Sequence, residues 1–277
     1  MLRAIFVTSS LPHGGAERHS IALTNRLAER GHECHAVYIM DSGGPLDAIR
    51  LRNGGTLRCL NAARYLDRRA VADFAAHIRR IRPSVVVAAN PFALMYSRLA
   101  LRRSGVRAPL AVTFHTTLLP SVKDWLQMLY YRPLFWSADC LVFVCEAQRR
   151  HWLPRGVFAR RMEVIYNGVD TEKFRDRWSP AERADLRRAL GFSATDFVIG
   201  ISAWLRPEKN HVQLVEAIAK LRRRGIPANA LMIGEGEMRA AIEARARELA
   251  VERSVAIAGL QHDVGPYLAA CDVVALC

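Results

Sequence analysis

The sequence lacks several features that would place it in a well-defined class. No apolar run approaches the roughly 18 residues that a membrane-spanning helix needs. The six cysteines include no C-x-x-C pair, and the first strand-to-helix turn carries neither G-x-G-x-x-G nor a G-K-[ST] motif. These absences argue against a transmembrane protein, a zinc- or disulfide-framed domain, and a nicotinamide or P-loop enzyme.

The opening segment, residues 1–7, is apolar but too short for a signal peptide, and no small-residue cleavage site follows it. We interpret it as the first strand of a cytoplasmic protein. Most cysteines sit inside apolar, β-like runs, which is typical of buried free thiols in a reducing compartment. No metal site is expected.

The net charge of +14 is unevenly distributed. Residues 1–175 hold 26 Lys or Arg against 13 Asp or Glu, whereas residues 176–277 hold 14 against 13. A basic half favours an anionic partner, either a phospholipid surface or a nucleic acid. The alternative is that arginine is simply the preferred surface residue of this chain.

Short β-branched runs alternate with amphipathic stretches, which predicts parallel sheets covered by helices on both faces. A first series of seven strands ends near Asn167. A second series begins at Phe197 and stops in a fourth strand, Asp272–Leu276. We therefore expect an α/β protein of two Rossmann-like, doubly wound domains, residues 1–170 and 171–277, the second of them incomplete.

Polar and glycine-rich segments follow several predicted strands. Gly14 and Gly15 lie between the first strand and the first helix, where the backbone can approach an anion at the helix N-terminus. A tight turn is the simpler explanation for them. His115 follows the strand Leu110–Phe114, where ligands of open α/β sheets bind. It could act in proton transfer, although a structural histidine fits as well.

In the second series, Arg206 and Lys209 follow the strand Phe197–Ser202 and lie three residues apart before a helix. Arginine offers a fork for phosphate oxygens and lysine a point charge, a pair suited to a diphosphate leaving group. The alternative is a solvated charge cluster. Two more strand ends carry the segments Gly234-Glu235-Gly236 and Gly259 to Val264. Together these loops predict a cleft.

Taken together, these segments resemble glycosyltransferase family 4, of the two-Rossmann-domain type called GT-B. The similarity rests on pieces in the family's order and spacing: Gly14-Gly15-Ala16-Glu17, Thr113-Phe114-His115, Val164 to Asp170, Leu205 to Asn210, Gly234-Glu235-Gly236, and Asp263-Val264 before Ala270 to Val274. It implies a retaining transfer of sugar from a nucleotide-diphosphate sugar to a glycan or lipid-linked acceptor, without a cofactor or an obligatory metal.

By matched position, the resemblance implies that Arg206, Lys209, Gly14 and Gly15 hold the donor diphosphate and that His115 is catalytic. It places the nucleotide pocket at Gly234, Glu235, Gly259, Asp263 and Val264. The basic first domain fits members that act on membrane-embedded acceptors, so peripheral contact with an anionic membrane is expected.

The resemblance also implies that the family's pair of glutamates would follow Cys277, so we expect a C-terminally truncated enzyme. Two other hypotheses stay open. One is a donor- or lipid-binding remnant without turnover. The other is a nucleic-acid-binding protein, against which the arginines are dispersed and no aromatic-interleaved basic strip occurs.

Overall fold

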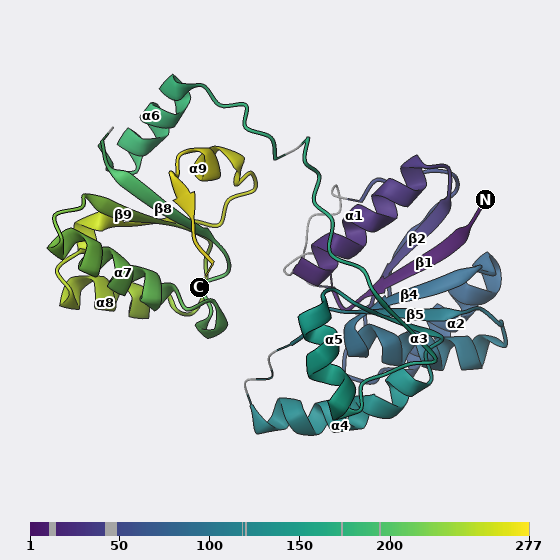
Figure 1. The fold of residues 1–277 in the computed structure, drawn as a ribbon. Coiled ribbons are helices and arrows are strands. Elements are labelled where there is room, and N and C mark those ends of the chain that lie inside the picture. Colours follow the sequence, from purple (N-terminus) through teal and green to yellow (C-terminus); the bar gives the residue numbers. More distant parts are fainter. Residues whose placement is uncertain are drawn as a thin grey trace. The chain divides into compact units, whose positions relative to one another are not determined.

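The computed structural model describes residues 1–10, 15–41, 49–117, 119, 121–172, 174–193 and 195–276. The chain divides into two compact units, Met1–Gly168 and Val169–Cys277. Each unit is an α/β body with its own sheet and its own core (Figure 1). The predicted α/β class with two Rossmann-like parallel sheets is confirmed.

The first unit is built on a seven-stranded parallel sheet of order β3-β2-β1-β4-β5-β6-β7. The strand order reverses between β1 and β4, which makes the carboxyl ends of these strands the natural place for a ligand. The strands are β1 (Arg3–Thr8), β2 (Glu33–Tyr38), β3 (Leu57–Cys59), β4 (Val85–Ala89), β5 (Leu110–Phe114), β6 (Cys140–Phe143) and β7 (Arg161–Val164).

Helices cover both faces of this sheet, so the strands are buried on both sides. Alternate residues of one strand therefore belong to different cores. Ile5 and Val7 of β1 belong to the large core, whereas Ala4 and Phe6 belong to a smaller one that includes Ala28. The helices of this unit are α1 (Gly15–Glu29), α2 (Arg68–Ile81), α3 (Asn90–Ser104), α4 (Val122–Trp136), α5 (Glu146–Trp152) and the 3-10 turn η2 (Leu153–Arg155).

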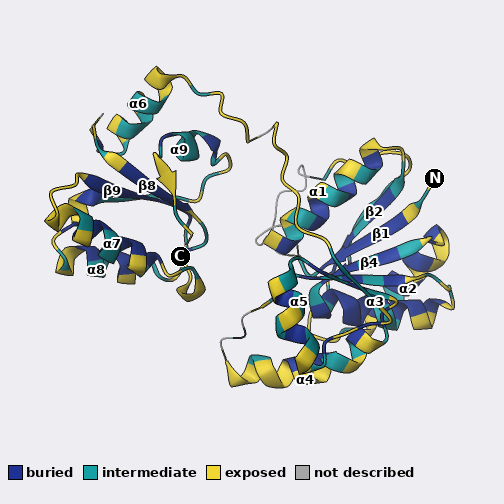
Figure 2. Ribbon diagram, viewed as in Figure 1, coloured by how far each residue is buried: buried dark blue, intermediate teal, exposed yellow. Residues whose placement is uncertain are grey.

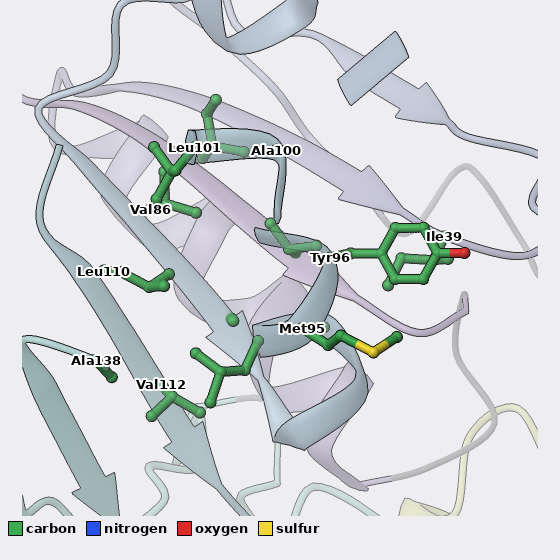
Figure 3. Close-up of a cluster of buried hydrophobic side chains, with 14 of the residues drawn as sticks. Ile39, Val86, Met95, Tyr96, Ala100, Leu101, Leu110, Val112 and Ala138 are labelled. Atoms are coloured by element: carbon green, nitrogen blue, oxygen red, sulfur yellow. The ribbon is translucent and has the colours of Figure 1, made fainter. Parts of the chain in front are cut away.

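The large core is centred on α3, which packs between the sheet and its neighbouring helices. Figure 3 shows Met95 and Tyr96 of α3 together with Val86, Leu110 and Val112 of the sheet. All five side chains are at most 2% exposed. Burying an aliphatic side chain of this size contributes ~1.5–3 kcal/mol, so α3 stabilises the strands whose ends carry the candidate site.

The second unit has four described parallel strands in the order β10-β9-β8-β11. They are β8 (Phe197–Ser202), β9 (Ala228–Ile233), β10 (Val255–Gly259) and β11 (Val273–Val274). The helices are α6 (Pro180–Ala189), α7 (His211–Arg223), α8 (Arg239–Glu248) and α9 (Gly265–Ala269), with 3-10 turns η3 (Pro207–Lys209) and η4 (Glu252–Ser254). Two cores lie on opposite faces of β8 and β9.

The fourth predicted strand of the second unit, Asp272–Leu276, is present but shorter than expected. β11 comprises only Val273 and Val274, which are 48% and 57% exposed rather than buried. Both pair with β8 alone, so their outer sides lack a neighbouring strand in the described residues. The five described cysteines are free thiols, but only Cys34 is buried, and the other four are partly exposed rather than buried as expected.

Candidate functional site

The carboxyl edge of the first sheet gathers the ends of β1, β4 and β5. Gly15 is the first residue of α1, and a Cβ placed on it would meet no atom within 4 Å. Among the described residues, therefore, no packed neighbour requires a glycine here, and the role of Gly15 in donor binding stays a prediction. Nearby, the Ser9 hydroxyl donates to Glu17 Oε1 at 3.2 Å, which ties the end of β1 to α1. Gly14 lies outside the described residues.

The backbone of His115 is anchored to the neighbouring strand end. Its N–H donates to Asn90 Oδ1 at 2.9 Å. Asn90 follows β4 and has a φ of +69°, a left-handed conformation that asparagine tolerates better than most residues. One asparagine thus turns the chain into α3 and holds the start of the β5–α4 connection.

The next residue, Thr116, is anchored from the other side. Its carbonyl oxygen accepts from Gln148 Nε2 at 3.2 Å and from Trp152 Nε1 at 2.9 Å. Gln148 is 1% exposed, and its Oε1 accepts from the Val144 N–H at 2.9 Å. The backbone at His115 and Thr116 is therefore held by partly buried hydrogen bonds to residues of α3 and α5, which fixes where the His115 side chain begins.

The His115 ring lies in a desolvated position. Its Nε2 is buried and has no hydrogen-bond partner, and the ring centroid lies 5.4 Å from that of His19 on α1. Burial, and secondarily repulsion from His19, lowers the pKa of His115 to about 4. Burial also lowers the pKa of His19. Both imidazoles are neutral at pH 7, so His115 can exchange hydrogen bonds with a hydroxyl group but is not a resident cation.

In the second unit, the connection after β8 packs tightly against the connection after β9. The Leu205 N–H donates to the Glu235 carbonyl at 3.0 Å, and the Met238 N–H donates to the Leu205 carbonyl at 3.0 Å. Gly234 and Gly236 allow this approach: a Cβ on them would lie 2.0 and 2.5 Å from the carbonyl oxygens of Ala203 and Leu205. The segment that presents Arg206 and Lys209 is thus held by backbone contacts.

Arg206 and Lys209 lie at the two ends of this short connection. Arg206 is exposed, with its guanidinium 5.7 Å from the centre of the Trp204 ring. The Lys209 N–H donates to the Arg206 carbonyl at 3.0 Å, which closes the η3 turn. Among the described residues, neither cation forms an ion pair with a carboxylate. Both charges are therefore available to an anionic ligand.

The predicted nucleotide-pocket residues cluster at the same edge of the second sheet. Gly234 and Gly259 form an isolated antiparallel bridge, and Glu235 Oε1 accepts from Arg239 Nη1 at 2.6 Å. Asp263 Oδ1 caps the Gly265 N–H at 3.0 Å. Val264 packs into the core beside α9. Each side chain thus has a structural role within the unit, and their assignment to a nucleotide pocket stays a prediction.

The structure adds residues that the sequence did not single out. Asn90 and Gln148 position His115 through long-range contacts, which no local pattern signals. His211, the first residue of α7, is 2% exposed, and neither ring nitrogen has a hydrogen-bond partner. A polar residue at a core-facing position two residues after Lys209 was the signal for it. Burial lowers its pKa, and Lys209 adds to the shift.

In the described part of the chain, no group of three or more His, Cys, Asp or Glu side chains is arranged to hold a metal ion. Among the same residues, no helix combines the length and apolar character needed to cross a bilayer.

Two parallel-sheet units with functional loops at their strand ends define the GT-B class of glycosyltransferase folds. The family model for Glycosyltransferase Family 4 matches residues 13–173, and the model for Glycosyl transferases group 1 matches residues 182–277. The chain belongs to Glycosyltransferase Family 4.

Known proteins agree with this assignment. The chain is 30% identical to the lipopolysaccharide core biosynthesis glycosyltransferase LpsE of Rhizobium meliloti (strain 1021), over 94% of this chain and 68% of LpsE. It is 32% identical to EpsD of Bacillus subtilis (strain 168), which is named as a glycosyltransferase, over 58% of this chain and 42% of EpsD. The chain thus spans less than half of EpsD.

The fold matches the crystal structure of Anabaena HepE in complex with UDP and glucose. The TM-score is 0.81 at 22% sequence identity, over 100% of this chain and 74% of the HepE chain. At this identity the likeness shows the shared fold.

Proposed function

We propose that the protein transfers a sugar from a nucleotide-diphosphate sugar to a glycan or lipid-linked acceptor on the cytoplasmic side of the membrane, with retention of anomeric configuration and without an obligatory metal ion. Family membership supports sugar transfer. The HepE complexes support a nucleotide-sugar donor. LpsE, named for lipopolysaccharide core biosynthesis, supports a glycan or lipid-linked acceptor.

The observation that carries the proposal is the pair Arg206 and Lys209. Negative charge grows on the departing nucleoside diphosphate as the glycosidic bond breaks, and fixed cations stabilise it where it develops. Arg206 is the N-cap of the 3-10 turn η3 and Lys209 its last residue, and neither has a carboxylate partner among the described residues. They can therefore meet the diphosphate without first breaking an internal ion pair.

The role that fits His115 is recognition of the reacting sugar. Nε2 of its neutral ring has no partner among the described residues. It can share a hydrogen bond with a sugar hydroxyl once the groups that bury it move aside. Because this bond forms in a water-poor environment, it is stronger than one at an exposed surface. The neutral ring makes His115 a positioning group rather than a general acid.

The test is steady-state turnover by the full-length protein with a panel of UDP- and GDP-sugars. Arg206→Ala and Lys209→Ala should each lower kcat/KM by about 30- to 1,000-fold, since one charged contact to the leaving group is worth ~2–4 kcal/mol. Arg223→Ala, an exposed arginine in the last turn of α7, is the matched control and should keep full turnover.

Three readouts separate the parts of the proposal. NMR of the fresh product reports the anomer, and an inverted product contradicts retention. Turnover that is lost with EDTA and restored by a divalent ion contradicts metal independence. Nucleotide binding without turnover of any donor would favour the non-catalytic donor-binding alternative.

A further inference from the structure

The amino edge of the first sheet, where β1, β4 and β5 begin, carries a cluster of arginines. In Figure 2 the N label marks this edge, because β1 begins at Arg3. The segments before β4 and β5 line two neighbouring hollows of about 490 and 530 Å³, which share Gly105, Val106 and Arg107. Five arginines of the described lining are here called the amino-edge arginines: Arg79, Arg82, Arg98, Arg102 and Arg107.

The amino-edge arginines lack the carboxylate partners that other arginines of the first unit have. Arg58 pairs with Asp73, and Arg161 pairs with Glu163. Among the described residues, none of the amino-edge arginines forms an ion pair. Arg79 Nη1 donates to the Arg103 carbonyl at 3.3 Å, which ties the end of α2 to the end of α3. The other four guanidinium groups are therefore not neutralised within the unit.

Arg98 of α3 provides the observation that a solvated charged surface does not explain. Its side chain is half-buried, and its Nε is buried without a hydrogen-bond partner among the described residues. A buried donor on a charged group is destabilising when it is unpaired, because it has lost its hydration. Arg98 also lines the hollow of about 490 Å³. An anion bound in that hollow can supply the missing acceptor.

The helix ends at this edge account for only part of the positive charge. α2 and α3 both end here, and each helix C-terminus carries about half a negative charge, which attracts arginine. Asp139 lines the first hollow and adds one carboxylate, whose Oδ2 accepts from the Leu110 N–H at 2.9 Å. Against the five amino-edge arginines, this leaves an excess of about three positive charges. Such an excess favours a multiply charged anion over a single carboxylate.

The surroundings of the hollows argue against a bilayer and against the candidate site described above. Residues 79–109 are all described, and none of their large apolar side chains is strongly exposed, so a bilayer would find no apolar anchor here. Pro109 in the lining and His115 lie at opposite ends of β5. About 20 Å of extended chain separates them. The hollows are therefore distinct from the carboxyl edge of the sheet.

We propose that the two hollows bind a small soluble molecule that carries two or more phosphate groups. Guanidinium groups match phosphate oxygens in a bidentate way and stay charged at any physiological pH. Because Arg107 belongs to both linings, two phosphate groups of one molecule can bind on its two sides. The volumes are in the range of small-molecule sites. This inference goes beyond the proposed function and does not depend on it.

The experiment is calorimetric titration of the full-length protein with pyrophosphate and with inorganic phosphate at constant ionic strength. The parent for all titrations is the variant Arg206→Ala/Lys209→Ala, so that a diphosphate bound in the second unit does not interfere. The parent should bind pyrophosphate at least about tenfold more tightly than inorganic phosphate, because the second phosphate group meets further guanidinium groups. A parent that does not bind pyrophosphate, or binds both anions equally, overturns the inference and leaves the proposed function untouched.

A matched pair of variants locates the binding. Arg102→Gln/Arg107→Gln, at two exposed positions of the lining, should bind pyrophosphate at least about tenfold more weakly than the parent. Arg30→Gln/Arg150→Gln removes the same charge at exposed positions outside both linings and should bind like the parent. Equal losses in the two variants would mean that only net charge matters, and would overturn the site.

Arg98→Lys tests whether the hollow is a built site. It keeps the positive charge but removes the buried Nε and the guanidinium fork, so pyrophosphate should bind at least about fivefold more weakly. Unchanged thermal midpoints show that the variants are folded. Binding equal to that of the parent would indicate a diffuse positive surface and contradict the proposal. So would a parent that ignores pyrophosphate but binds phosphatidylglycerol vesicles or single-stranded RNA in a manner that Arg102→Gln/Arg107→Gln weakens.

Discussion

The candidate functional residues of the first unit and those of the second are held in place by opposite means. In the first unit, His115 is desolvated and neutral, its N–H donates to Asn90 Oδ1, and the carbonyl of the next residue, Thr116, accepts from Gln148. In the second unit, Arg206 and Lys209 are charged groups in contact with water, on a connection held by close backbone packing.

This difference follows from the chemistry that His115 on the one hand, and Arg206 and Lys209 on the other, would perform. Burying the cations without a partner would cost several kcal/mol, so they stay hydrated and rely on a rigid backbone for their position. A hydrogen bond between an imidazole and a hydroxyl group is stronger where water is excluded. The second unit should therefore be sensitive to backbone changes, and the first to changes in polarity and pH.

The largest loss of stability is expected from Gly234→Ala in the second unit. The new Cβ would lie 2.0 Å from the Ala203 carbonyl oxygen, and the backbone φ of +151° is unfavourable for alanine. The substitution should lower the free energy of unfolding of this unit by about 3 kcal/mol or more. Urea denaturation of the full-length protein measures the loss.

Gly225→Ala separates steric overlap from backbone strain. Gly225 also has a positive φ, +79°, but a Cβ there would meet nothing within 4 Å. The substitution should lower the free energy of unfolding by only about 1–2 kcal/mol, which is the strain of an alanine in the left-handed conformation. Equal losses at both positions would show that the close packing between the two loops does not matter.

A somewhat smaller loss of stability is expected in the first unit when the pH is lowered. Burial, followed by nearby Arg80, Arg58 and His35, lowers the pKa of His77 to about 4, against a weaker opposing effect of Asp73. The folded state therefore binds fewer protons than the unfolded chain. The contribution of His77 to the free energy of unfolding is fully present above pH 6.5. As the pH falls towards 4, about 3 kcal/mol of it is lost.

The measurement is the free energy of unfolding at several pH values for the wild type and His77→Gln. Other groups also titrate in acid, so the difference between the two pH profiles is the informative quantity. His262→Gln, at an exposed position, should leave the profile unchanged. Identical profiles for the wild type and His77→Gln would contradict a depressed His77 pKa.

The sequence predicted most of the fold because strand and helix periodicities are local. It did not identify α3 and α6. Both sides of α3 hold apolar residues, because α3 packs between the sheet and neighbouring helices, and this obscures the helical stripe. α6 was detectable, since Ser179 and Glu182 form a capping box.

The candidate site was predictable where it depends on strand ends and not where it depends on tertiary contacts. His115 and Arg206 follow strands, so their edge of the sheet follows from the pattern. The roles of Asn90 and Gln148 depend on hydrogen bonds across 25 and 32 residues of sequence.

Gln148→Leu tests the anchoring of His115. It removes one bond to the Thr116 carbonyl and leaves the Val144 N–H without its partner. The first unit should lose about 2 kcal/mol of stability, and kcat should fall more than donor affinity because His115 is displaced. Gln213→Leu, on the exposed side of α7, is the matched control for the stability loss. Unchanged stability and unchanged kcat would show that this buried network does not position His115.

The smallest effect is expected from His19→Asn, which addresses why His115 is neutral. Burial is the main cause of its lowered pKa, and His19 is the secondary one. Removing the second imidazole should therefore raise the pKa of His115, but the rise should stop well short of the ordinary value of 6.5. NMR titration of the His115 ring protons measures the shift, with His262→Asn as the control at a distant exposed position. A return to 6.5 would show that the His19 charge, rather than the dry surroundings, keeps His115 neutral. The first unit would then resemble the second, because charge rather than the exclusion of water would determine the state of its candidate residue.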